Sequence, residues 1–155
     1  MIHQCGDKDR ATANVHGVLD ALLLQHMTAR TTEPLIIDLE GVVTMTTAGR
    51  RALIALMKQS DPRALAIDNC PRFLIESINA TPALLGGHHR AHRIRSLYAP
   101  YSCKSCNVTT EAWVARHEIK IVRSCVRAPL RACHYCGQRM TLATDPQDFF
   151  LFLVS

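Results

Sequence analysis

Two pairs of cysteines constrain this chain more than any other feature of its sequence. Cys103 and Cys106 form the first pair, and Cys133 and Cys136 form the second, 26 residues further on. Two residues between thiolates let one tight turn direct both sulfurs at a single ion, and two such turns together give tetrahedral coordination by four cysteines. The spacing therefore predicts one structural Zn²⁺ ion, with no open position at which the metal could activate water.

Two other uses of the same cysteines have weaker support. Four thiolates also bind iron, as in a rubredoxin-type site. A single pair with this spacing can be redox-active. One shared zinc ion explains both pairs and their separation together, so it is the interpretation we carry forward.

Composition and cysteine usage favour a folded protein of a reducing compartment. The chain is 48% hydrophobic and 20% charged, as expected for a globular domain. It has no run of eighteen apolar residues that could span a membrane, and its first residues lack the basic and then apolar pattern of a secretory signal. We therefore expect a cytoplasmic protein in which the seven cysteines favour metal binding over disulfides.

The charge of the chain does not by itself indicate a nucleic-acid partner. The formal net charge is +5. A zinc ion held by four thiolates carries a net charge of −2, which lowers the total to about +3. An excess this small is compatible with many kinds of partner.

The distribution of cysteines divides the chain into two predicted domains, residues 1–97 and residues 98–155. In the first domain, short apolar runs alternate with segments of helical periodicity, which predicts a mixed α/β sheet, mostly parallel, with helices mainly on one face. The expected strands are residues 11–16, 35–39, 64–68 and 94–98, and the expected helices are residues 18–29, 50–59 and 72–78.

Three stretches of the first domain resemble the STAS domain of bacterial anti-sigma-factor antagonists: residues 17–20, residues 35–42 and residues 46–49. The resemblance covers roughly residues 10–97. It implies a STAS-like fold and a protein that binds partners, such as a serine-kinase anti-sigma factor or an ATPase subunit. It also implies that the loop entering the second helix belongs to the contact.

In the family this loop is Asp-Ser-Ser-Gly, and the second serine is phosphorylated. Here the loop is Thr46, Thr47, Ala48 and Gly49, so the usual acceptor position has no hydroxyl. The resemblance leaves Thr46 and Thr47 as candidate phosphorylation sites. The alternative is that they only cap the helix, a role for which Thr47 is suited. With Arg50 and Arg51, the two threonines form the predicted partner surface.

The second domain resembles a small β zinc ribbon. Residues 111–115 and 118–122 are expected to form a hairpin between the cysteine pairs, and Asp145 and Pro146 are expected to begin a terminal helix. Bacterial proteins that carry a zinc ribbon directly after a STAS-like domain are similar over nearly the whole chain. The apolar residues of the terminal helix are expected to pack on the body, although an exposed docking peptide is an alternative.

A basic segment before the ribbon supports a second hypothesis. It forms a candidate patch for nucleic acid or an acidic partner, whose members are His88, His89, Arg90, His92, Arg93 and Arg95. The ribbon is also basic, and Trp113 and Tyr135 could stack on bases. A nucleic-acid-binding module is therefore the alternative function, and a solvated loop is the plainer interpretation of the patch.

The sequence offers no evidence of catalysis. It contains no nucleophile elbow, phosphate-binding loop or zinc-protease motif. Asp38 and Asp68 end two predicted strands and are expected to cap loops at the carboxyl edge of the sheet, although α/β folds bind ligands at that edge. We therefore expect a non-catalytic regulator or scaffold that acts by binding another protein, such as a kinase, an ATPase or a subunit of an assembly.

Overall fold

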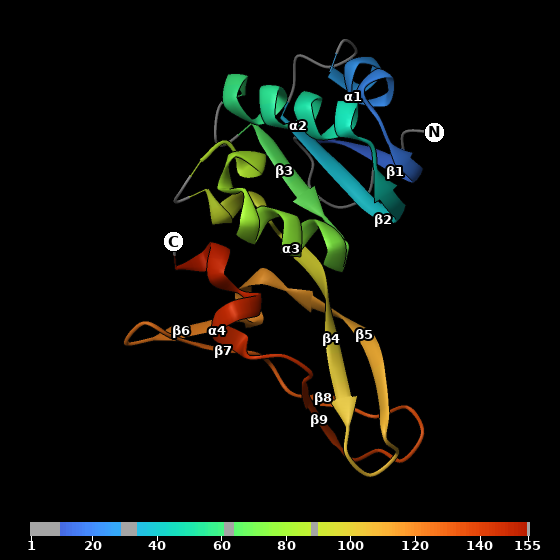
Figure 1. Cartoon of the computed structure of the whole chain (residues 1–155), viewed down its shortest axis with the longest axis vertical. Helices are drawn as coiled ribbons and strands as arrows, with labels where there is room; N and C mark the ends of the chain where they lie inside the picture. The colour runs from blue at the N-terminus through green and yellow to red at the C-terminus, as the bar shows by residue number, and fades with distance from the viewer. Residues whose placement is uncertain (1–9, 29–33, 61–63, 88–89, 155) are drawn as a thin grey trace.

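The computed structural model describes residues 10–28, 34–60, 64–87 and 90–154. Over these residues the chain has a mixed α/β fold, as the sequence predicts, with helices in the first half and short antiparallel strands in the second (Figure 1). The described residues include no helix that is both long and apolar enough to cross a membrane.

A parallel sheet forms the first half. Its strands lie in the order β1-β2-β3, and helices connect them. The strands are β1 (Ala11–Leu19), β2 (Leu35–Met45) and β3 (Leu65–Asp68), and the helices are α1 (Ala21–Thr28), α2 (Thr47–Gln59) and α3 (Arg72–Ala80). The predicted alternation of strands and helices over this half is confirmed.

The first strand is longer than its sequence pattern indicates. Gly17, the first residue after the expected strand, has a φ of +78° and lies inside β1, which pairs with β2 as far as Leu19 and Met45. The ladder to β2 holds Val18 and Leu19 in extended conformation despite their helical periodicity. The helix predicted from residue 18 therefore begins at Ala21.

Burial explains the two apolar runs in the middle of this half. Ile36 and Ile37 in β2 and Ala66 and Ile67 in β3 are consecutive residues that point to opposite faces, and all four are buried. A strand covered on both faces requires a continuous apolar run. Figure 1 shows α1 and α2 packed together beside this sheet.

Strand β4 (Ser96–Cys103) connects the two halves. At its start, parallel bridges join Ile94 to Ile67 and Leu97 to Cys70, next to β3. The strand then pairs along its whole length with β5 (Val108–Ala115) in the second half. The predicted boundary between the two domains, between residues 97 and 98, thus lies inside one continuous strand.

The second half contains two small antiparallel units. One sheet has the order β5-β4-β9-β8, with β8 at Arg131–Ala132 and β9 at Arg139–Leu142. A separate hairpin pairs β6 (Lys120–Val122) with β7 (Cys125–Arg127). The predicted hairpin of residues 111–115 with residues 118–122 is therefore wrong: both segments contain strands, but β5 pairs with β4 and β6 pairs with β7.

The C-terminal segment packs on the body, as predicted. Helix α4 (Pro146–Phe149) begins after Asp145, whose carboxylate accepts a hydrogen bond of 2.8 Å from the amide of Gln147. Phe149, Phe150 and Phe152 are buried. They contribute to a core that continues from the parallel sheet into the second half.

Candidate metal centre

The four cysteines of the two pairs come together in space. All four sulfur atoms lie within 4.8 Å of one another. The sulfurs of Cys103 and Cys136 are 3.6 Å apart, and those of Cys106 and Cys133 are 3.9 Å apart. Zn–S bonds of about 2.3 Å place the sulfurs of a tetrahedral site about 3.8 Å apart, so this cluster fits a single zinc ion.

The two turns of the cluster share one backbone feature. The residue after each pair is in the left-handed region: Asn107 has a φ of +52° and Gly137 a φ of +70°. In the second turn, the amide of Gly137 donates to the carbonyl of Cys133 at 2.9 Å. Glycine adopts this conformation without strain, and asparagine tolerates it better than most residues.

The strands position the ligands at one end of the second half. Cys103 is the last residue of β4, and Cys133 directly follows β8. These two cysteines are buried, Cys106 is half-buried and Cys136 is exposed. An ion in the cluster would therefore tie together two strands of the sheet while one side of the site remains near solvent.

Electrostatics within the cluster favour replacement of protons by a cation. Hydrogen bonds from the amides of Tyr135 and Cys136 lower the pKa of Cys133 to about 7. A hydrogen bond with Cys136, followed by burial and the other two thiols, raises the pKa of Cys106 to about 12. Four thiolates this close cannot all be charged without a compensating ion, and a divalent cation supplies that charge while releasing the protons.

The remaining described cysteines lie apart from the cluster. Cys125 is exposed in β7, on the separate hairpin. Cys70 is buried at the end of β3, and burial raises the pKa of its thiol well above the usual range. Cys5 is outside the described residues. The predicted ligand set of Cys103, Cys106, Cys133 and Cys136 therefore matches the cysteines that come together.

The loop predicted to contact a partner lies at the start of α2. Thr46 caps this helix, because its Oγ1 accepts a hydrogen bond of 2.9 Å from the amide of Gly49. Thr47, which was expected to be the cap, is the first helical residue. Thr46, Thr47 and Arg51 are exposed, whereas Arg50 is half-buried and donates to Thr81 Oγ1 at 2.8 Å.

The predicted basic patch is wrong at Arg93. This side chain is only 1% exposed, so it contributes no charge to a surface. His92 is exposed, and Arg90 and Arg95 are half-buried. Arg95 also forms an ion pair of 3.6 Å with Asp68. His88 and His89 lie outside the described residues.

Asp38 and Asp68 lie side by side, as the two strand ends suggest. They are register partners in the ladder between β2 and β3. Asn69, which the sequence did not single out, joins them to the second half: its Nδ2 donates to Asp38 Oδ1 and its Oδ1 accepts from Trp113 Nε1, both at 2.9 Å. Asn69 has a φ of +53°, in the region that asparagine visits more readily than most residues.

Comparison with known proteins adds no assignment, since the chain matches no protein-family model and no curated protein.

Proposed function

We propose that this chain is a non-catalytic regulator or scaffold of the bacterial cytoplasm that acts by binding another protein. In this proposal, residues 1–97 are a STAS-like domain that carries the contact surface, and residues 98–155 are a zinc ribbon. The parallel sheet with helical connections and the capped helix after β2 support the STAS-like assignment.

Exposed apolar side chains beside the start of α2 are the observation that carries the proposal. Val43 in β2 is 74% exposed and Val18 in β1 is 45% exposed. Val18 pairs with Thr44, and the carbonyl of the next residue, Leu19, accepts a hydrogen bond from the amide of Thr46. Val18 and Val43 lie on neighbouring strands beside the polar loop, and together they would give a partner apolar surface to cover.

We define the α2-start surface as Val18, Val43, Thr46, Thr47 and Arg51. All five residues are exposed. Arg51 is exposed and provides positive charge for an acidic partner, whereas Arg50 supports the surface through its hydrogen bond to Thr81. The proposed occupant is a kinase, an ATPase or a subunit of an assembly.

Phosphorylation would act on the same surface. The hydroxyl of Thr46 already accepts the capping hydrogen bond, so we propose Thr47 as the better acceptor of a phosphate. A phosphate at the first helical position would interact favourably with the helix dipole. It would also place two negative charges beside Arg51 and weaken binding to an acidic partner.

The zinc ion has a structural role in this proposal. Four cysteine ligands complete a tetrahedral site and leave no position for substrate. A segment as short as residues 98–155 can bury only a small core, and metal coordination would add stability that such a core does not supply.

A pull-down from nuclease-treated lysate of the native host tests the proposal. Wild-type protein is compared with a Val43→Ser, Arg51→Glu variant. The matched control is Ile121→Ser, Arg127→Glu, which makes the same changes at exposed residues of the β6–β7 hairpin. We expect the first variant to lose a partner that the control retains, and equal capture by both variants would contradict the proposed surface.

A second candidate function is nucleic-acid binding by the ribbon. Tyr135 lies between two zinc ligands and is 76% exposed, and Lys104, Arg139 and His134 are exposed on the same two turns and the adjoining strand. An exposed ring surrounded by positive charge is suited to stacking on unpaired bases. Binding of single-stranded nucleic acid that weakens steeply with salt and with Tyr135→Ala would favour this function over the first.

A further inference from the structure

We propose that the β6–β7 hairpin binds double-stranded DNA by entering its major groove, with Lys120 and Arg127 at the phosphates. The hairpin includes no residue of the α2-start surface. It also does not include Tyr135, and its ligand is a duplex rather than the unpaired bases of the second candidate function. The proposal therefore depends on neither of those functions.

The β6–β7 hairpin is a separate ribbon with one fully exposed face. Within the described residues its two strands pair only with each other, and Figure 1 shows its turn at the outer left of the molecule. Val126 is buried and belongs to the core, which attaches the hairpin to the body. The register pairs on the other face are Lys120 with Arg127 and Val122 with Cys125, and all four residues are exposed. This face is open to a ligand along the hairpin.

Two positive charges lie directly opposite each other on this face. Opposite residues of antiparallel strands have Cβ atoms about 4.5–5.5 Å apart, and like charges at such positions are destabilising. Among the described residues, neither Lys120 nor Arg127 forms an ion pair. A row of phosphates would place negative charge beside both side chains and remove the repulsion.

The turn of the hairpin adds a third cation at its outer end. It consists of Arg123 and Ser124, whose φ angles are +49° and +65°. A two-residue turn with both residues in this region favours asparagine and glycine, because other side chains are strained there. Such strain is common at functional sites. Here it places an exposed arginine at the tip of the hairpin.

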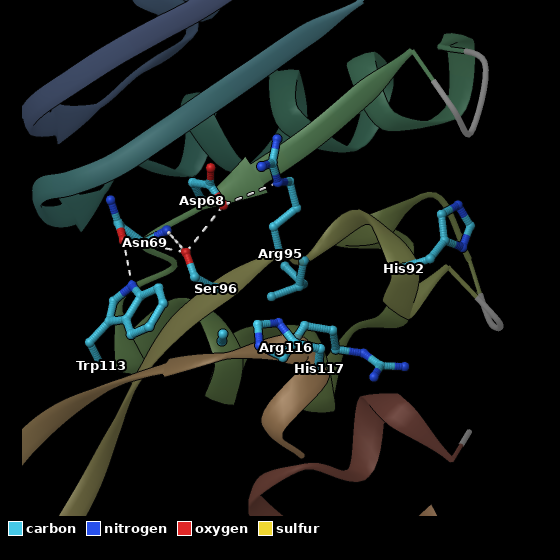
Figure 2. Close-up of a pocket in the computed structure, with 10 residues that line it drawn as sticks. Asp68, Asn69, His92, Arg95, Ser96, Trp113, Arg116 and His117 are labelled. Carbon is cyan, nitrogen blue, oxygen red and sulfur yellow. Dashed lines mark hydrogen bonds and ion pairs between the residues drawn. The ribbon is translucent and has the colours of Figure 1, made fainter. Parts of the chain in front are cut away.

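Acidic residues of the hairpin do not compensate these three charges. Residues 119–130 contain no aspartate or glutamate, and the preceding Glu118 is held by Arg131 at 2.7 Å. Arg95 is the contrasting case: Figure 2 shows it turned toward Asp68, with which it forms the ion pair of 3.6 Å. The hairpin therefore carries a concentrated positive charge, which attracts a polyanion.

A DNA duplex is the polyanion that fits the shape of this hairpin. The major groove of B-form DNA is about 12 Å wide and admits a two-stranded ribbon, whereas the major groove of an RNA duplex is too narrow for side chains to read. An anionic membrane would require apolar residues at the leading end, where this hairpin has Arg123 and Ser124. In the groove, Lys120 and Arg127 would contact phosphates, and Val122, which is 47% exposed, would contact thymine methyl groups.

Fluorescence anisotropy with the full-length, zinc-loaded protein and a labelled DNA duplex about two helical turns long tests the proposal. We expect saturable binding whose log Kd rises linearly with log salt concentration. The double variant Lys120→Gln, Arg127→Gln should raise the Kd at least about tenfold and lower the slope of that line by about two. It should be at least as stable as wild type in urea denaturation, because it removes the repulsion between two like charges.

The matched control is Arg51→Gln, Lys58→Gln, which removes the same charge from exposed positions of α2 and should leave the Kd unchanged. Tyr135→Ala should also leave duplex binding unchanged, so failure of this proposal is distinguishable from failure of the second candidate function. Three results would each overturn the proposal: no duplex binding, equal losses in the two double variants, or hairpin-dependent binding to phosphatidylglycerol vesicles that is tighter than binding to the duplex.

Discussion

The guanidinium group of Arg93 donates a 2.7 Å hydrogen bond to the carbonyl oxygen of Met57, in the last turn of α2. The same group donates to the carbonyls of Ser60 and Leu85 at 2.9 Å and 3.2 Å. The last carbonyls of a helix have no partners within the helix, and they lie at the negative end of its dipole. Arg93 therefore caps α2 from inside the protein, which explains how a buried arginine is stabilised.

Replacement of Arg93 should destabilise the protein strongly. In Arg93→Lys, one ammonium group cannot reach all three carbonyls, at the end of α2 and at Leu85. We expect the free energy of unfolding to fall by at least about 2 kcal/mol in urea denaturation. Arg72→Lys changes an exposed ion pair with Glu76 and should cost less than about 0.5 kcal/mol. Equal losses for the two variants would contradict the capping role.

Asn79 should be needed to hold the C-terminal segment. Its Nδ2 donates to the carbonyl of Phe149 at 2.9 Å, and its Oδ1 accepts from the amide of Phe152 at 3.0 Å. Asn79→Ala leaves both backbone groups without this partner and should cost about 1–3 kcal/mol in the same assay. Hydrogen exchange at the Phe152 amide should accelerate. Asn14→Ala, at an exposed position of β1, is the control and should change neither quantity.

Removal of the metal should unfold the second half. We expect one zinc ion per chain, and a chelator should abolish the near-ultraviolet circular dichroism signal of Trp113. Cys103→Ser should lose the metal, because it removes one of four ligands, whereas Cys125→Ser should retain it, because Cys125 lies outside the cluster. A folded Cys103→Ser protein with a full equivalent of zinc would refute the proposed coordination.

Gly49 should not tolerate a side chain. A Cβ at this position would overlap the carbonyl oxygen of Leu19, which belongs to rigid backbone. Gly49→Ala should therefore destabilise the protein by about 1–3 kcal/mol despite the better helix propensity of alanine. Ala48→Ser, at the exposed neighbouring position, should have little effect, and a stabilised Gly49→Ala variant would show that β1 and α2 are less closely packed than described.

The Glu118 carboxyl should titrate below its ordinary range. Hydrogen bonds from Arg131, the shorter one 2.7 Å long, are the largest cause of its lowered pKa. A carboxyl whose pKa is lower in the folded state contributes stability above its unfolded pKa, and this contribution disappears as the pH falls through the folded pKa. A carbon-detected NMR titration should show the low pKa in wild-type protein and a higher one in Arg131→Gln. The same pKa in both would contradict this cause.

The features predicted best from the sequence are those that depend on residues close together in the chain. Three local patterns each had one structural interpretation: the cysteine pairs predicted a metal site, Asp145 predicted a helix start, and the apolar runs of β2 and β3 predicted buried strands. Arg93 looked like a surface residue because it lies in a segment rich in histidine and arginine, and its partners at positions 57, 60 and 85 are brought to it only by the fold. For the same reason, sequence reasoning expected residues 111–115 to pair with the segment that follows them, although β5 pairs with β4.

The arrangement of β4 determines how a disturbance at one end of the protein reaches the other. The strand begins against β3 and ends at Cys103, so a single extended strand of eight residues runs from the edge of the parallel sheet to the first cysteine of the cluster. An extended strand with a fixed register transmits a displacement along its length, unlike a flexible tether. Binding or release of zinc is therefore expected to alter the sheet edge itself, and with it the geometry of every residue that lines the edge.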